Sequence, residues 1–437
     1  MNILVRYRPV GRNASEISAS VETAIRGGEL APGDHLPPVR ALAQELGVSP
    51  TTVAAAYREL RRRGITTGAG RGGTQIRPAP PVGIRGNQRP PDGARDLLTG
   101  APDPSLLPAL PGRSGAMRLY ADTQIAPRLR GLAAERLAAD GIDPANLAVT
   151  GGALDGIERV LATWLTPGDR VAVEDPGHAV TFDLVAAMGL VAVPVPVDGY
   201  GMRPAGLTAA LDRGVNAVIF TPRAQAATGA AWDAARAAEL RSAVGRHPSA
   251  AIIEDDHAGP VSGTAVHSLC AGMDRWVNIR SVSKSLGPDL RLAVLAGDEA
   301  TIARVAGRQA LGTGWVSFQL QETVADLWHD PAIARAAQVY AGRREALLAA
   351  LAAQHIPVTG GRSGLTCWIP VTDEDRVTAA MTAAGWAIAA GRRYRIAAPP
   401  GVRICFATLT EAEAAPFAAD LARALLYHPP RHPTRLD

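Results

Sequence analysis

A single lysine stands out among the positively charged side chains. Of the 45 cationic residues, 44 are arginine and one is Lys284. Arginine keeps its proton at any workable pH, whereas a lysine amine can lose its proton and act as a nucleophile. Arg291 follows seven residues later, and a neighbouring cation both lowers the pKa of an amine and binds phosphate. The pair predicts a site that attacks an aldehyde and holds a phosphate group, although a solvated surface lysine is the plainer alternative.

Two further segments could complete such a site. The segment AAIIEDDHAG places Asp255 at the C-terminal end of an expected strand, where parallel sheets bind ligands. A carboxylate there can keep a pyridine nitrogen protonated, so that the ring acts as an electron sink. The turn VTGGALDGIERVL joins an expected strand to a helix through two glycines, and its N–H groups can cradle a phosphate. An exposed acidic cluster of Glu254, Asp255 and Asp256 is the competing interpretation.

The elements that must position these residues alternate along the chain. Segments rich in β-branched residues are separated by alanine-rich stretches of helical character. Strands that alternate with helices indicate an α/β fold, with a largely parallel sheet covered on both faces. The expected strands are RVAVED, VAVPVPV, NAVIF, AAIIED, WVNIRSVS and RLAVLAG.

The charge distribution divides the chain. Residues 1–77 hold eleven Arg against six acidic residues, a balance of +5, whereas residues 96–437 hold 31 basic against 34 acidic residues, a balance of −3. Between them, residues 78–95 contain five Pro and three Gly, the composition of an extended linker. We expect a basic domain over 1–77, a linker over 78–95 and a large domain over 96–437.

The basic domain has the pattern of a winged helix-turn-helix. A first helix is expected over Ser15–Arg26, and ALAQELGVSPTTVAAAYRELRRRG reads as two helices broken at Gly47. Ser49 can cap the second of these. ITTGAGRGGTQI then gives two short strands around a glycine-rich tip with Arg71, which can enter a minor groove. The expected buried face of the recognition helix is Val53, Ala56, Tyr57 and Leu60.

This region resembles the winged helices of GntR-type bacterial transcription factors, over the stretch from GELAPGDHLPP to RGGTQI. The resemblance implies binding to double-stranded DNA. A helical scaffold or dimer interface that does not bind DNA is the alternative. The predicted DNA-contacting residues are Arg40, Thr51, Thr52, Arg71 and Gly72.

The large domain resembles fold type I aminotransferases that use pyridoxal 5′-phosphate (PLP), with a smaller C-terminal α/β subdomain. Motifs in the same order carry the resemblance: LYAD, VTGGALDGI, VEDPGH, FTPRAQAATG, IIEDDH, SVSKSLGPDLRL and VRICFATL. It implies that Lys284 forms the internal aldimine and Asp255 pairs with the ring nitrogen. It assigns the phosphate to Ser281, Ser283, Arg291 and the Gly152–Ala153 turn, with Tyr120 reaching it across a dimer interface, and the substrate or effector carboxylate to Arg403.

Several positions depart from the aminotransferase pattern around the expected ring. His178 replaces the aromatic residue that usually follows EDPG, and His257 replaces the tyrosine that usually follows EDD. Either imidazole can still stack or form hydrogen bonds. Ala153, Leu154 and Ala224 replace polar residues. These changes remove side-chain hydrogen bonds around the cofactor.

A GntR-like winged helix joined to an aminotransferase-like domain resembles the MocR subfamily of GntR regulators. The resemblance implies a homodimer that binds PLP, senses an amino compound or PLP itself, and controls transcription. Two alternatives stay open: a PLP-dependent aminotransferase with a vestigial winged helix, and a regulator whose pocket no longer uses PLP. Transaminase chemistry could be retained in part.

Composition adds limits on location and metal use. Three scattered cysteines predict free thiols in a reducing compartment, so a cytoplasmic protein is expected. No apolar run reaches the roughly 20 residues of a membrane helix, and the histidines show no metal-ligand spacing. We therefore predict neither a membrane partner nor a metal.

Overall fold

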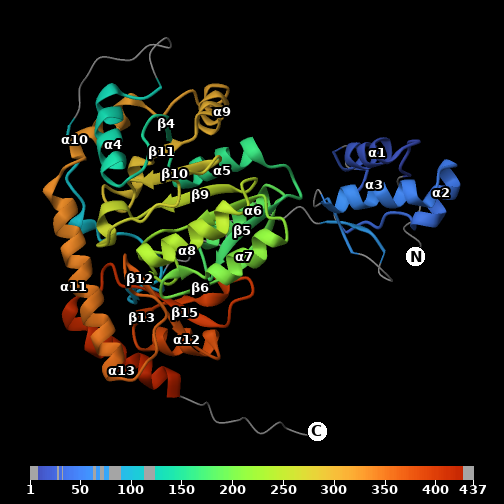
Figure 1. The fold of residues 1–437 in the computed structure, drawn as a ribbon. Helices are drawn as coiled ribbons and strands as arrows, with labels where there is room; N and C mark the ends of the chain where they lie inside the picture. The colour runs from blue at the N-terminus through green and yellow to red at the C-terminus, as the bar shows by residue number, and fades with distance from the viewer. Residues whose placement is uncertain are drawn as a thin grey trace, which may run out of the picture.

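The computed structural model describes residues 8–26, 29–31, 33–62, 65–68, 73–77, 90–112 and 124–426. Figure 1 shows a small helical part built from α1 to α3, to one side of a larger part built on a central sheet. The predicted fold class, a winged helix followed by an α/β domain with a mostly parallel sheet, is confirmed.

The small part is a three-helix bundle with a two-stranded wing. Gly47 adopts φ 65° and ends the second helix, and the Ser49 hydroxyl accepts a hydrogen bond from the Thr52 N–H at 3.1 Å to begin the third. The four expected apolar positions of the third helix are each at most 1% exposed. The elements are α1 Ala14–Arg26, α2 Val39–Leu46, α3 Pro50–Arg62, and the antiparallel strands β1 Thr66–Thr67 and β2 Gln75–Ile76.

In the described part of the chain, the central sheet has eight strands in the order β4-β11-β10-β9-β8-β5-β6-β7. The five strands from β10 to β6 are parallel, while β11 runs opposite to both its neighbours and β7 opposite to β6. The six expected strands all lie in this sheet. The bounds are β4 Leu147–Thr150, β5 Arg170–Asp175, β6 Val191–Asp198, β7 Gly201–Met202, β8 Ala217–Phe220, β9 Ala251–Asp256, β10 Trp276–Ser281 and β11 Ala293–Gly297.

Helices cover both faces of the sheet, as Figure 1 shows. Because side chains alternate along a strand, Val171 and Val173 enter one apolar core and Ala172 enters the other. Helices α5 Ala153–Trp164, α6 Ala179–Ala187 and α9 Glu299–Ala310 contribute to the first core. Helices α4 Pro127–Ala139, α7 Pro204–Asp212, α8 Ala234–Gly245 and α10 Phe318–Leu327 contribute to the second.

The smaller C-terminal subdomain has its own core and takes one strand from the start of the large part. The three-stranded sheet β12-β15-β14 packs with α11 to α13, and β3 pairs in parallel with β13, so that residues about 290 positions apart lie side by side. The elements are β3 Arg95–Asp96, α11 Pro331–Ala353, β12 Thr366–Pro370, α12 Glu374–Ala383, β13 Trp386–Ala387, β14 Ala389–Ala390, β15 Gly401–Cys405 and α13 Glu411–Leu426, with the 3-10 turns η1 Pro104–Leu106, η2 Gly259–Ser262, η3 Pro288–Leu290 and η4 Gly391–Arg393.

None of the described helices is long and apolar enough to span a membrane.

Candidate functional site

A cavity of about 650 Å³ lies between the central sheet and the C-terminal subdomain. Strands β5, β8, β9 and β10 are parallel, so their C-terminal ends meet at one edge of the sheet, and the residues that follow them line the cavity. This is the usual ligand position in open α/β sheets. Nine predicted site residues line it: Ala153, His178, Asp255, His257, Ser281, Ser283, Lys284, Arg291 and Arg403. Gly152 adjoins it through Arg291, and Tyr120 lies outside the described residues.

Lys284 follows β10 and is half-buried. Its Nζ donates a hydrogen bond to the carbonyl oxygen of Gly100 at 2.6 Å. Burial lowers the pKa of Lys284, and the nearby Arg403 guanidinium lowers it further. A lowered pKa makes the neutral, nucleophilic amine easier to reach near neutral pH.

Asp255 ends in the same cavity with an unused acceptor. The residue is 6% exposed, and its Oδ1 is buried without a hydrogen-bond partner among the described residues. Burial, together with the neighbouring Asp256, raises the pKa of Asp255 to about 7. A protonated pyridine nitrogen would supply both the missing donor and a positive charge, so this orphaned carboxylate fits the ring of PLP.

The turn before α5 has room for an anion. Gly152 adopts φ 106°, and a Cβ atom there would lie 2.8 Å from Nη2 of Arg291. Arg291 takes a left-handed conformation at φ 41°, and its Nη2 donates to the carbonyl of Gly151 at 3.2 Å. A guanidinium held over a helix N-terminus is a phosphate-binding arrangement. Ser281 and Ser283 line the cavity from the end of β10.

The two histidines are uncharged at neutral pH. Burial lowers the pKa of His178 to about 3 and that of His257 to about 4, and the cation of Lys284 adds to both shifts. His178 Nδ1 lies 2.9 Å from the Thr181 hydroxyl, which fixes the ring at the start of α6. His257 Nδ1 lies 3.8 Å from Asp255 Oδ2. Both rings line the cavity as flat, neutral groups that can stack on or hydrogen-bond to a ligand.

Arg403 is buried on β15 at the subdomain side of the cavity. Its Nε donates to the carbonyl of Ala226 at 2.7 Å and its Nη1 to the carbonyl of Leu98 at 3.1 Å. The guanidinium carbon lies 4.9 Å from the centre of the Tyr394 ring. Two of its five N–H donors are thus engaged with backbone, and the others are available to a carboxylate.

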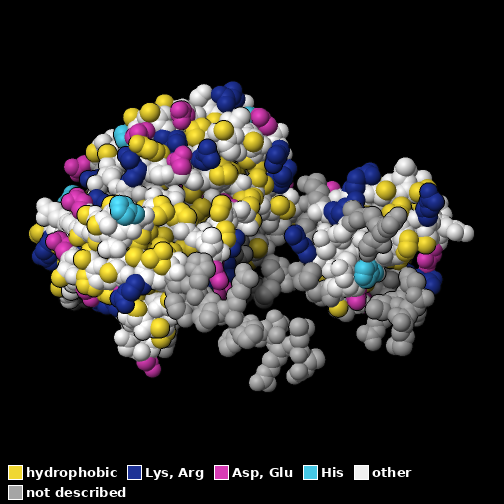
Figure 2. Space-filling model, turned by 90° about the horizontal axis from the view of Figure 1, so that it is seen from below, with side chains coloured by type: hydrophobic (Ala, Val, Ile, Leu, Met, Phe, Trp, Pro, Cys, Tyr) yellow, Lys and Arg dark blue, Asp and Glu magenta, His cyan; other side chains and the backbone are white. Residues whose placement is uncertain are grey.

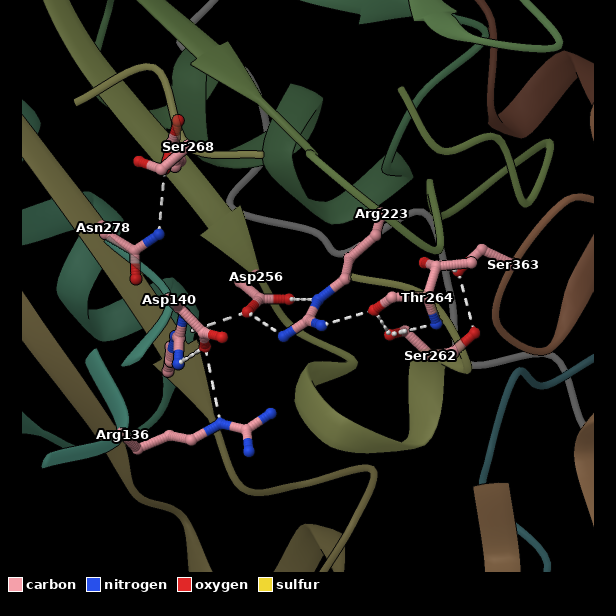
Figure 3. A network of polar contacts seen from close by, with 11 residues as sticks. Arg136, Asp140, Arg223, Asp256, Ser262, Thr264, Ser268, Asn278 and Ser363 are labelled. Atoms are coloured by element: carbon pink, nitrogen blue, oxygen red, sulfur yellow. Dashed lines mark hydrogen bonds and ion pairs between the residues drawn. The ribbon is translucent and has the colours of Figure 1, made fainter. Parts of the chain in front are cut away.

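Behind Asp255, a buried polar network holds the end of β9. Arg223 forms a bidentate ion pair with Asp256, at 2.8 and 2.7 Å, and donates to the carbonyl of Thr264 at 2.7 Å (Figure 3). Burial would raise the pKa of Asp256, but pairing with Arg223 outweighs it, and the pKa is lowered. Thr264 in turn contacts Ser363, which precedes β12. The network therefore ties the strand that carries Asp255 to the C-terminal subdomain.

Sequence reasoning missed three parts of the site. Residues 98–102 cross the cavity wall, Tyr394 lies against Arg403, and Gln225 is buried where its amide donates to Glu174 and to the carbonyl of Pro176. For Gly100 no signal existed, because its contact with Lys284 joins positions 184 residues apart. For Gln225, its position directly after the departure at Ala224 was the available signal.

The predicted DNA-contacting residues that the structure describes lie in the first turns of α2 and α3. Arg40 is exposed in the first turn of α2, and Thr51 is exposed in the first turn of α3, beside the half-buried Thr52. The hydroxyls of Thr51 and Thr52 lie 2.6 and 2.8 Å from that of Ser49. Figure 2 shows dark blue arginine atoms on the surface of this small part. Arg71 and Gly72 lie outside the described residues.

The fold and the two sites define a class of protein: a winged-helix DNA-binding part joined to an aminotransferase-like part. Comparison with known families agrees. Residues 13–76 match the family of bacterial regulatory proteins of the gntR type, and residues 96–421 match aminotransferase class I and II. The chain belongs to both families and is a transcriptional regulator of the combined MocR type.

Curated relatives named as transcriptional regulators match between about half and nearly all of the chain. The vitamin B6 salvage pathway transcriptional repressor PtsJ of Salmonella typhimurium is 39% identical, over 95% of this chain and 99% of the relative. The regulator TauR of Rhodobacter capsulatus is 30% identical, over 86% of this chain and 88% of the relative. The pyridoxine biosynthesis regulator PdxR of Corynebacterium glutamicum is 29% identical, over 55% of this chain and 56% of the relative.

Solved structures confirm the fold of the large part. The α-aminoadipate aminotransferase LysN of Thermus thermophilus superposes with a TM-score of 0.67 at 20% identity, over 76% of this chain and 92% of that one. The kynurenine aminotransferase of Pyrococcus horikoshii gives a TM-score of 0.69 at 19% identity, over 77% and 91%.

Proposed function

We propose that this regulator binds PLP covalently through Lys284 and that occupancy of the pocket changes its affinity for an operator in double-stranded DNA. The carrying observation is that one cavity brings together an amine with a lowered pKa, a buried carboxylate oxygen without a donor, and an anion cradle at Gly152 and Arg291. These groups match the aldehyde, ring nitrogen and phosphate of PLP.

Each residue has a distinct task in this proposal. Lys284 supplies the nucleophile, Asp255 holds the proton at the ring nitrogen, and Arg291 with the start of α5 binds the phosphate. His178 and His257 contact the ring as neutral groups. When bound, PLP supplies an electrophilic aldehyde and an electron-accepting ring. Arg403 remains for the carboxylate of an amino-group effector.

PLP itself is the primary signal in our proposal, and an amino compound bound at Arg403 is a secondary one. The relatives PtsJ and PdxR are named for vitamin B6 salvage and pyridoxine biosynthesis, and the chain covers 99% of PtsJ. We further propose a cytoplasmic homodimer. The three cysteines are buried and unpaired, which fits a reducing compartment.

Absorption between about 300 and 500 nm tests cofactor binding, because a bond between PLP and a lysine gives a visible band. We expect the purified protein to gain this band with PLP, and borohydride to fix the label on Lys284. Since the sequence has a single lysine, Lys284→Ala leaves only the N-terminal amine as a competitor. Lys284→Arg keeps the positive charge but not the nucleophile, so it must also lack the band. A band of equal strength in both variants would overturn the assignment.

A DNA-binding measurement tests the regulatory half. An operator is first selected from random-sequence duplexes with the wild-type protein. We then expect PLP to change the affinity of the wild type for that duplex and to leave the affinity of Lys284→Arg unchanged. Rapid conversion of an amino donor and a keto acid, with no specific duplex recovered, would favour the enzyme instead.

A further inference from the structure

Five residues at the start of the large part, Leu98 to Pro102, all line the cavity. We call this segment the strap. Two cations of the site donate to its backbone: Lys284 Nζ to the carbonyl of Gly100 at 2.6 Å, and Arg403 Nη1 to the carbonyl of Leu98 at 3.1 Å. In this structure two of the side chains expected to bind the ligand are therefore bound by the strap.

The strap is anchored at both ends. On its N-terminal side, Leu97 is fully buried in the subdomain core, its N–H donates to the carbonyl of Ala387 at 2.9 Å, and its carbonyl accepts from the N–H of Cys405 at 2.8 Å. On its C-terminal side, the N–H of Asp103 donates to the Tyr340 hydroxyl at 3.0 Å, and its carboxylate pairs with Arg343 at 2.8 Å. If the strap moves, either its own backbone changes conformation between these anchors or the neighbouring strand β3 moves with it.

Gly100 is shaped for its contact. Its φ is 72°, and a Cβ atom there would lie 2.5 Å from Nη2 of Arg403. Any other residue at this position would have a strained backbone, and its Cβ atom would overlap the Arg403 guanidinium. A glycine at this position therefore lets the carbonyl reach Lys284 while the backbone passes close to Arg403.

The contact between Lys284 and Gly100 competes with the chemistry proposed for Lys284. When a neutral amine condenses with an aldehyde, its nitrogen forms a C=N bond, and its two hydrogens leave with the aldehyde oxygen as water. The carbonyl of Gly100 then loses its donor. A buried carbonyl without a donor is unfavourable, so the strap is displaced when the lysine is occupied.

We infer that the strap is a built-in competitor of the ligand, and that its release transmits the state of the Lys284 pocket to the winged helix. This inference rests on the proposed function. Residues 96 and 97 alone separate the strap from the predicted linker, 78–95, which leads to the winged helix. The strap thus gives two states with different contacts at one site, as coupling between a ligand site and a DNA site requires.

Two variants release the strap without any ligand. Gly100→Ala does so by overlap with Arg403, and Lys284→Met by loss of the donor. Gly272→Ala is the matched control, because its φ is 78° and a Cβ there meets no atom within 4 Å. In the ligand-free, full-length proteins, we expect amide hydrogen exchange over 98–102 to be at least fivefold faster in Gly100→Ala and Lys284→Met than in wild type and Gly272→Ala.

The same proteins test the coupling through their affinity for the selected duplex. We expect Gly100→Ala and Lys284→Met to shift this affinity at least fivefold, in the same direction as PLP shifts the wild type, while Gly272→Ala stays within twofold. Faster exchange with unchanged DNA affinity would show that release of the strap does not reach the winged helix. Unchanged exchange would show that the contacts with Lys284 and Arg403 do not hold the strap in place.

Failure of the proposed function would look different. If the wild type shows no absorption band with PLP, the cofactor assignment fails. Hydrogen exchange in the two ligand-free variants still tests whether Lys284 and Arg403 hold the strap in place. Gly100→Ala removes no side-chain donor or acceptor, whereas Lys284→Met removes an amine. If both variants change hydrogen exchange and DNA affinity in the same way, the cause is release of the strap and not loss of the amine.

Discussion

The carboxylate of Asp255 lies 3.8 Å from Nδ1 of His257, and their pKa values are displaced in opposite directions, to about 7 and about 4. Burial is the main cause of both shifts, since it disfavours the charged form of an acid and of a base alike. Without a ligand, the pair therefore tends toward neutrality near pH 7. A pyridinium ring would change this, because its charge stabilises the ionised Asp255.

Asp255→Asn should stabilise the ligand-free protein at high pH. The folded pKa of about 7 exceeds the unfolded value of 3.8, so the folded state holds the extra proton between those values and loses stability as pH rises through them. We expect the free energy of unfolding of the variant, relative to wild type, to rise by about 2 to 4 kcal/mol between pH 4 and pH 8.

Tryptophan fluorescence during urea unfolding measures this difference in the large part alone, because all seven tryptophans lie between residues 164 and 386. The same variant should bind PLP more weakly. Asp289→Asn, at an exposed carboxylate in η3, is the control. A stability difference that does not change with pH would show that Asp255 is ionised in the ligand-free protein.

The buried pair of Arg223 and Asp256 makes a second prediction. Arg223 and Asp256 have side chains 3% and 0% exposed, so removing the guanidinium leaves a buried anion. Arg223→Met should lower the free energy of unfolding by about 3 kcal/mol. Arg280, whose Nε lies 3.4 Å from the same carboxylate, moderates the loss.

Urea unfolding checks this prediction against Arg128→Met, which removes an ion pair to Asp326 with 53% and 28% exposure and should cost less than about 1 kcal/mol. Adding Asp256→Leu to Arg223→Met should recover part of the loss. Equal effects of Arg223→Met and Arg128→Met would mean that the buried network contributes no more than a surface pair.

The sequence was sufficient to predict the winged helix, six strands of the central sheet and the edge of that sheet where the candidate site lies, because these depend on local periodicity and on motif order. It could not predict the strap. Gly100 and Lys284 meet through the return of the chain after the predicted linker, and no spacing rule relates them. Likewise, sequence alone left open whether Asp255 was an exposed acid, and only packing shows it to be buried with an unused oxygen.

Gly152 offers a test of the phosphate cradle. A Cβ at this position would lie 2.8 Å from Nη2 of Arg291, and φ is 106°, so Gly152→Ala should push Arg291 away from the start of α5. Gly151→Ala is the neighbouring control, because its nearest contact would be 3.4 Å, to Asp155. We expect Gly152→Ala to weaken PLP binding at least tenfold.

Pyridoxal, which lacks the phosphate, separates this effect from general damage to the pocket. In absorption titrations, the preference of wild type for PLP over pyridoxal should shrink in Gly152→Ala and persist in Gly151→Ala. A parallel loss of affinity for both compounds would place the phosphate elsewhere.

Arg40 tests the DNA-binding surface. Its side chain is exposed in the first turn of α2, and the segment just before α2 is tied to α3 by a hydrogen bond from the Tyr57 hydroxyl to the carbonyl of Pro37 at 2.8 Å. A phosphate contact from Arg40 would make Arg40→Ala weaken operator binding about five- to tenfold and reduce the slope of log affinity against log salt by about 1. Arg308→Ala removes the same charge from an exposed position on α9 in the large part, so it controls for net charge. If both variants lose affinity equally, the effect is one of overall charge, and Arg40 does not contact the DNA.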